Sequence, residues 1–286
     1  MKFILKNYLP TFIITFILVS VLLLLSNFDF NLIKKASNLE TRILIIFYGN
    51  SWIISISILT ASLFSSFVAF RKLNISLKED KTEFSISSSY FLKYLILIAV
   101  VIFVVILYFN FNMLPEHNKN YVGLYHKIIN PLNQKITLNE KNPRIDRGLP
   151  REMTYSELIG AIEIVEHNLS SNESPNFTRY NQKKIRMYVA ELSKRFIISF
   201  GCIILMFLGA IFGLTYRKDL KFAFPILKIF VVVYFFSLIY LEKLVVIQGF
   251  SYLTLYIITI IKFSISIILW FTKAKKIMLT NKELVN

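Results

Sequence analysis

Three lysines interrupt long apolar runs and are the first candidates for chemistry in this chain. Lys262 stands in the middle of its run, whereas Lys93 and Lys228 lie near the ends of theirs. A charged group at membrane depth is costly and marks a candidate functional site. Lys93 and Lys228 are close enough to an end to extend their ammonium groups to the interface. Because the apolar runs contain almost no Asp or Glu, the sequence shows no acidic partner for Lys262.

Motifs for metal, nucleotide or thiol chemistry are missing from the sequence. The single cysteine, Cys202, lies in an apolar run, so no intramolecular disulfide can form. His, Cys and acidic residues do not occur at CxxC or HExxH spacing, and there is no GxxxxGK[ST] loop for ATP phosphates. We therefore expect no catalytic residue, no metal and no cofactor on this chain, and we do not expect an enzyme.

Composition points to a polytopic membrane protein. Of 286 residues, 55% are hydrophobic, the mean hydropathy is +0.58 and the net charge is +16. The apolar residues form blocks about 20 residues long, which is the helix length that crosses a bilayer core. The basic residues lie at the ends of these blocks and not on one soluble face, so membrane topology and lipid headgroups explain the charge better than nucleic acid does.

The apolar blocks predict an all-α membrane protein with six transmembrane helices, three before a polar insertion and three after it. The predicted spans are about 8–25, 43–70, 90–111, 196–216, 222–241 and 251–272. The domains expected from them are residues 1–111, the insertion 112–195, residues 196–272 and a basic tail 273–286.

Lys and Arg in the short connections predict the orientation. The side with the N-terminus, 71–89, 217–221 and the tail carries about 13 of them, against about four on the other side. Both termini are therefore expected in the cytoplasm, with residues 112–195 facing outward.

The outward segment is expected to combine short strands with helices. Residues 131–150 are rich in Pro, Asn and charge, which favours one or two short strands with turns. Residues 154–168 predict a helix, with Thr154 and Glu157 spaced as in a capping box. After a break at 170–175, a charged amphipathic helix begins near Arg179 and continues into the fourth span.

Four stretches resemble the LptF/LptG family, the six-span permease subunits of the lipopolysaccharide export ABC transporter. They are, in order, NFDFNLIKKAS, FNMLPEHNKNY, REMTYSELIGAIE and RYNQKKIRMYVAELSKRF. Together with the span count and the position of the insertion, the resemblance covers nearly the whole chain.

The resemblance implies a permease subunit in the inner membrane that works with partners. These are a cytoplasmic ABC ATPase dimer, a second LptF/LptG-like subunit or a second copy of this chain, and a periplasmic bridge protein. Lipopolysaccharide or a related anionic glycolipid would enter between the two subunits. Lys34 and Lys35 match a lysine pair of the family, and with Arg42 they are the expected lipid-binding residues. The alternative is an interfacial snorkelling pair.

Two further sites follow from the resemblance. Residues 71–89 occupy the place of the family's coupling helix, which docks on the ATPase, and Lys78, Glu79, Asp80 and Glu83 are the expected coupling residues. A solvated charged loop is the alternative. At the start of the fourth span, Glu191 is expected to form a local structural ion pair with Lys194 and Arg195.

The outward segment departs from the family pattern. Only about 36 residues separate Pro115 from Glu152, too few for an eight-stranded jellyroll. Two other functions therefore stay open. An ion-coupled secondary transporter would need paired ionisable residues near the bilayer midplane, and a degenerate permease would act as a membrane scaffold without an ATPase.

Overall fold

The computed structural model describes residues 2–26, 30–36, 38–79, 88–129, 149–171, 175–216, 220–251, 253–269 and 272. The first half contains α1 (Lys2–Ser26), α2 (Phe30–Lys35), α3 (Leu39–Gly49), α4 (Trp52–Glu79), α5 (Ser88–Tyr108), a π-helical turn (Phe109–Met113) and α6 (Leu114–Ile129). The second half contains a 3-10 turn (Pro150–Glu152), α8 (Tyr155–Ser171), α9 (Pro175–Thr215), α10 (Leu220–Gln248) and α11 (Leu253–Leu269).

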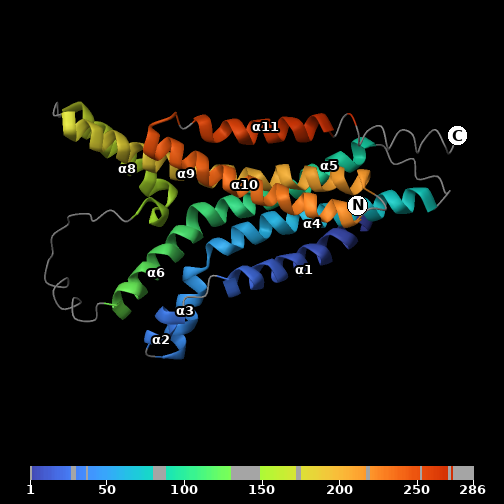
Figure 1. Cartoon of the computed structure of the whole chain (residues 1–286), viewed down its shortest axis with the longest axis horizontal. Coiled ribbons are helices and arrows are strands. Elements are labelled where there is room, and N and C mark those ends of the chain that lie inside the picture. The colour runs from blue at the N-terminus through green and yellow to red at the C-terminus, as the bar shows by residue number, and fades with distance from the viewer. Residues whose placement is uncertain are drawn as a thin grey trace.

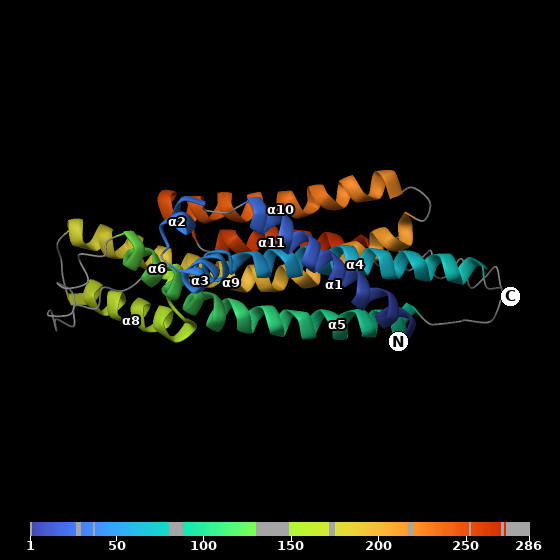
Figure 2. The same cartoon turned by 90° about the horizontal axis from the view of Figure 1, so that it is seen from below.

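The long helices run roughly side by side, and the start of α1 lies at the same end of the bundle as the end of α11 (Figures 1 and 2). Helices α2, α3, α6 and α8 gather at the opposite end. No strand occurs among the residues described; the predicted strands at 131–150 fall almost entirely outside them.

Five of the described helices are long and apolar enough to cross a membrane. They are Ile4–Ser26, Trp52–Ser76, Leu92–His126, Asn176–Thr215 and Ala223–Gln248. The sixth predicted span corresponds to α11, which has 17 described residues and is about 25 Å long at 1.5 Å per residue. All-helical architecture and multiple membrane spans are thus confirmed, whereas the sixth span is represented by a shorter apolar helix.

The predicted second span, 43–70, was wrong in one respect, because the helix breaks inside it. Helix α3 ends at Gly49 and α4 begins at Trp52. At the break, Asn50 donates its side-chain amide to the Ile46 carbonyl at 2.9 Å, and Ser51 donates its hydroxyl to the Tyr48 carbonyl at 3.0 Å. These short polar side chains replace helix hydrogen bonds with local ones.

Helices α4 and α9 form the centre of the bundle and make the most extensive contact of any two elements. Gly209 and Gly213 of α9 face the backbone of α4 so closely that a Cβ on either would overlap the carbonyl oxygens of Leu63 and Phe67, respectively. Small residues at such an interface let two backbones approach. The contact explains why α9 is buried along its apolar half, whereas the 18-residue apolar stretch of α1 has none of its residues buried.

Three hydroxyl-bearing residues of α4 are satisfied without a partner on α9. Thr60, Ser62 and Ser66 each donate a hydroxyl to the carbonyl four residues earlier, at 2.7–2.9 Å. These hydroxyls are satisfied within their own helix and still occupy little volume. They therefore suit the crowded α4–α9 interface at little electrostatic cost.

Candidate functional site

The start of the fourth predicted span carries a buried network of charges. Glu191 accepts from Lys194 Nζ at 2.6 Å and from Arg195 Nε at 3.0 Å. Lys194 also reaches Glu242 of α10 at 3.0 Å. The three residues singled out in the sequence therefore lie together, and Glu242 adds a fourth charge that links α9 to α10.

Arg195 is the most deeply buried member of this network, with 1% of its surface exposed. Besides Glu191, its guanidinium donates to the carbonyl oxygens of Met153 at 2.6 Å and Pro150 at 3.1 Å. A planar fork with several fixed donors suits two carbonyls and a carboxylate at once. Arg195 thereby joins α9 to the 3-10 turn that precedes α8.

A chain of buried polar side chains continues from Arg195 into the membrane region. The Arg195 carbonyl accepts from Ser199 Oγ at 2.9 Å, and Ser199 Oγ accepts from Asn110 Nδ2 at 3.1 Å. Asn110 Oδ1 in turn accepts from Ser55 Oγ at 2.6 Å. Asn110 lies in the π-helical turn, a feature that often marks functional positions, and it connects α4 with α9.

Asn110 and Glu242 were not predicted from the sequence. An asparagine between two phenylalanines in the stretch LYFNFNM is a signal that would have found the first. Nothing in the local sequence points to the pairing of Glu242 with Lys194, because 48 residues separate them. The π-helical turn also carries the helix onward, so the third predicted span continues into α6 instead of ending at Phe111.

Lys34 and Lys35 are the last two residues of α2, and both are exposed. Leu32 and Ala36 hold this short helix by packing against Ile45 of α3. Cationic side chains also interact favourably with the carbonyl end of a helix. The lysine pair is thus exposed at the end of the bundle opposite the start of α1.

Arg42 is placed differently from the lysine pair. Its Nε and Nη2 both donate to the Ala36 carbonyl at 3.3 Å, just after the end of α2. It therefore fixes α2 against α3 and is engaged by the protein itself. This contact sets the position of Lys34 and Lys35 and leaves Arg42 less available to a ligand.

The expected coupling residues fall at the edge of the described chain. Lys78 and Glu79 are the last two residues of α4, and their side chains are not described, while Asp80 and Glu83 lie outside the described residues. The backbone of α4 extends three residues beyond the apolar stretch that ends at Ser76. The far end of α4 thus emerges at the end of the bundle where α1 starts (Figure 2).

Lys262 has neutral partners. Its Nζ donates to Ser237 Oγ of α10 at 3.0 Å and lies 4.7 Å from the centre of the Tyr234 ring. Cation–π contact and a hydroxyl acceptor offset part of the cost of the buried charge. No carboxylate lies within 4.0 Å of it in the part of the chain that the structure describes, as the sequence indicates.

Helix α8 is held to α6 by an ion pair that should respond to pH. Lys119 Nζ lies 2.6 Å from Glu157 Oε1, and Glu157 also accepts from the Thr154 amide at 2.7 Å, the backbone half of the predicted capping box. The hydrogen bond from Lys119 holds the pKa of Glu157 below its ordinary value. Because a lowered carboxyl pKa stabilises the fold above the ordinary value, this contribution is lost as pH falls through the lowered pKa.

We expect Glu157→Gln to destabilise the protein at pH 7 and to have a smaller effect at pH 3.5, where more of the Glu157 carboxyl is protonated. Both side chains of the pair are more than 40% exposed, so the difference at pH 7 should be below about 1 kcal/mol. Thermal unfolding of the two proteins at each pH measures it. An equal difference at both pH values would contradict the ion-pair account, and Glu163→Gln, at an exposed position of the same helix, is the control.

Among the described residues, no group of three His, Cys, Asp or Glu side chains could hold a metal ion. The described side chains instead offer two kinds of surface. One is cationic, at the end of α2, and the other consists of the apolar faces of α1 and α10, exemplified by Leu25 and Phe236, which are 66% and 69% exposed. In a membrane such faces meet lipid or another subunit.

A comparison with known protein families gives a match to this chain. A family model described as "Lipopolysaccharide export system permease LptF/LptG" matches residues 126–273, which is slightly more than half of the chain. The matched range contains α8, α9, α10 and α11, and with them the Arg195 network. Searches of curated proteins and of solved structures found no match to this chain.

Proposed function

The chain belongs to the LptF/LptG permease family, and on that premise we propose that it is the permease subunit of an ABC-type lipid exporter. The proposed cargo is lipopolysaccharide or a related anionic glycolipid, moved from the inner membrane toward the periplasm. The family match over 126–273 is the observation that carries this proposal. Lifting an acyl chain out of a bilayer costs about 0.8 kcal/mol per exposed CH₂ group, so export needs an energy source.

That energy source is proposed to be a separate ATPase dimer, because this sequence contains no phosphate-binding GxxxxGK[ST] loop. The end of α4, with Lys78 and Glu79, and the following residues to 89 would dock on it. A helix that continues rigidly from a span can transmit closure of the ATPase to the membrane. This site precedes the matched range and is supported by its position after the second span.

The proposed topology has six spans, with α11 as the sixth and both termini in the cytoplasm of a multi-pass inner-membrane protein. Residues 112–195 would face the periplasm, although α9 itself runs unbroken through residue 195. The excess of Lys and Arg on the terminal side supports this orientation. It also places the coupling residues and the lysine pair on opposite sides of the membrane.

One cysteine scan tests coupling and topology together. In a background with Cys202 replaced, cysteines along 71–89 should crosslink to the ATPase in the assembled complex. A cysteine at position 142 should react with a membrane-impermeant reagent in spheroplasts. The coupling assignment is rejected if no position in 71–89 crosslinks, and the topology is rejected if position 142 reacts only after lysis.

Lys34 and Lys35 are proposed to contact the anionic headgroup of the cargo. Both are exposed at the end of α2, and ammonium groups pair with lipid phosphates at about 1 kcal/mol each. Changing both to Glu should reduce photocrosslinking of lipid to this end of the protein by about tenfold or more, since attraction becomes repulsion. Arg42→Gln serves as a comparison, because Arg42 is bound to the Ala36 carbonyl. Unchanged lipid crosslinking and transport in the Lys34→Glu/Lys35→Glu variant would reject this assignment.

The proposed partners beyond the ATPase are a second permease subunit, either a relative or another copy of this chain, and a periplasmic bridge protein. The exposed apolar faces of α1 and α10 provide surface for the second subunit. Recovery of these partners with the protein from native membranes tests their assignment.

A further inference from the structure

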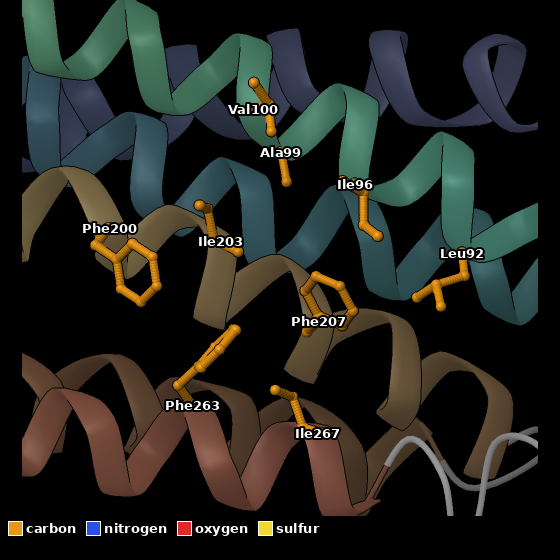
Figure 3. A pocket seen from close by; sticks show the side chains of 9 residues that line it. All are labelled: Leu92, Ile96, Ala99, Val100, Phe200, Ile203, Phe207, Phe263 and Ile267. Carbon is orange, nitrogen blue, oxygen red and sulfur yellow. The ribbon is translucent and has the colours of Figure 1, made fainter.

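An apolar cavity of about 350 Å³ lies between α5, α9 and α11. Figure 3 shows Phe200, Ile203 and Phe207 of α9 at its base, with α5 on one side and α11 on the other. All nine lining side chains are Leu, Ile, Val, Ala or Phe. The rings of Phe200 and Phe263 meet edge to face, 5.3 Å apart between centroids, so the walls are well defined.

The position of the cavity determines what can fill it. Helices α5 and α11 both pack on α9, and the lining residues lie in apolar helices of the membrane region. Ile96 and Val100 of α5 are 43% and 45% exposed, so the cavity wall is also part of the outer surface. At this depth the solvent is hydrocarbon, and an all-apolar cavity offers water no hydrogen-bond partner. An acyl chain is therefore the fitting occupant.

A cationic residue, Lys93, lies on the same side of α5 as the cavity, near the start of that helix. Lys93 precedes Val100 by seven residues, which places both on one stripe of the helix. Its side chain is exposed, and it has no carboxylate within 4.0 Å among the described residues. A chain seated beside Val100 would thus bring its headgroup toward an unneutralised ammonium group.

We propose that this cavity binds one acyl chain of an anionic phospholipid from the leaflet at the end of the bundle where α1 starts, with its phosphate at Lys93. The lipid would connect α5 of the first half with α11 of the second by filling the space between them over α9. It is a resident lipid. It differs from the cargo because its binding site faces the surrounding bilayer and lies far from Lys34 and Lys35.

Two matched substitutions test the acyl-chain site. Val100→Trp places an indole at the cavity wall, whereas Val101→Trp adds the same side chain at the neighbouring position, which is 56% exposed and does not line the cavity. The full chain, without ATP or ATPase, is reconstituted in nanodiscs containing phosphatidylglycerol and analysed by native mass spectrometry after stepwise delipidation. We expect about tenfold lower occupancy of the last retained lipid in Val100→Trp and wild-type occupancy in Val101→Trp. Equal retention in all three proteins would overturn the proposal.

The wild-type protein provides a test that does not depend on the folding of a variant. Phosphatidylglycerol with a photoreactive acyl chain should label peptides containing 92–100 and 263–267 in preference to the exposed face of α1. Uniform labelling would overturn the site.

The headgroup contact has its own test. Lys93→Gln should lower the preference of the protein for phosphatidylglycerol over phosphatidylcholine about fivefold. An unchanged preference would show that Lys93 does not bind the headgroup. Because no nucleotide or partner is used, these results are independent of the exporter proposal.

Discussion

Replacing Arg195 with methionine should lower the free energy of unfolding by about 3 kcal/mol or more, the loss expected when one partner of a buried ion pair is removed. The substitution deletes the donors to Glu191, Met153 and Pro150 at 3.0, 2.6 and 3.1 Å. Two carbonyls and part of a carboxylate would then be buried without those partners. Unfolding followed by steric trapping in mild detergent measures the change.

Further variants separate the charge of Arg195 from its geometry. Arg195→Lys keeps the charge but cannot present three fixed donors, so it should recover only part of the loss. Adding Glu191→Gln to Arg195→Met should restore some stability, because less charge is left buried. Lys184→Met on the same helix is the control; its ammonium lies over Tyr180 and should matter little. A loss below about 1 kcal/mol for Arg195→Met would show that the network does not hold the 3-10 turn to α9.

Gly209→Val should disrupt the centre of the bundle more than any substitution on its surface. A Cβ at Gly209 would overlap the Leu63 carbonyl oxygen and the Ser66 hydroxyl. A backbone carbonyl in a helix cannot move aside without moving α4, so overpacking here should cost about 3 kcal/mol or prevent folding. The fraction of monodisperse protein after membrane extraction, together with its unfolding temperature, measures the effect.

The chain offers a matched control for this glycine. A Cβ added at Gly160 of α8 would have no neighbouring atom within 4 Å, so Gly160→Ala should leave folding intact and stabilise α8 by about 0.5–1 kcal/mol. Because a Cβ at Gly209 overlaps the facing backbone whereas a Cβ at Gly160 meets no atom within 4 Å, the two substitutions should change stability in opposite directions. A Gly209→Val protein as stable as the wild-type protein would contradict the close backbone contact between α4 and α9 at Gly209.

Composition and periodicity were sufficient to predict the apolar helices but not where each one is interrupted. Runs of apolar residues locate five long helices because bilayer thickness fixes the length of a span. The break between α3 and α4 depends on the local hydrogen bonds of Asn50 and Ser51, which an apolar average hides. The π-helical turn at Phe109–Met113 is likewise invisible to periodicity, since it changes the register by a single residue.

The contacts of the charged residues also divide into local ones, which the sequence predicts, and distant ones, which it does not. Glu191, Lys194 and Arg195 are within one helical turn, so their meeting follows from helix geometry alone. The bonds from Arg195 to Met153 and Pro150 span 42 and 45 residues and depend on how α8 and α9 pack. The bond from Arg42 to the Ala36 carbonyl was likewise not predicted, because it depends on how α2 and α3 pack, and the lipid contact expected of Arg42 stays a prediction.

The proposed role in export is tested most directly by purifying this protein at native expression in mild detergent and identifying what accompanies it. An exporter subunit should bring with it a soluble P-loop ATPase, a second six-span subunit or a second copy of this chain, and an anionic glycolipid in the extracted lipids. Recovery of the protein without an ATPase, repeated in several detergents and in nanodiscs, would contradict that role.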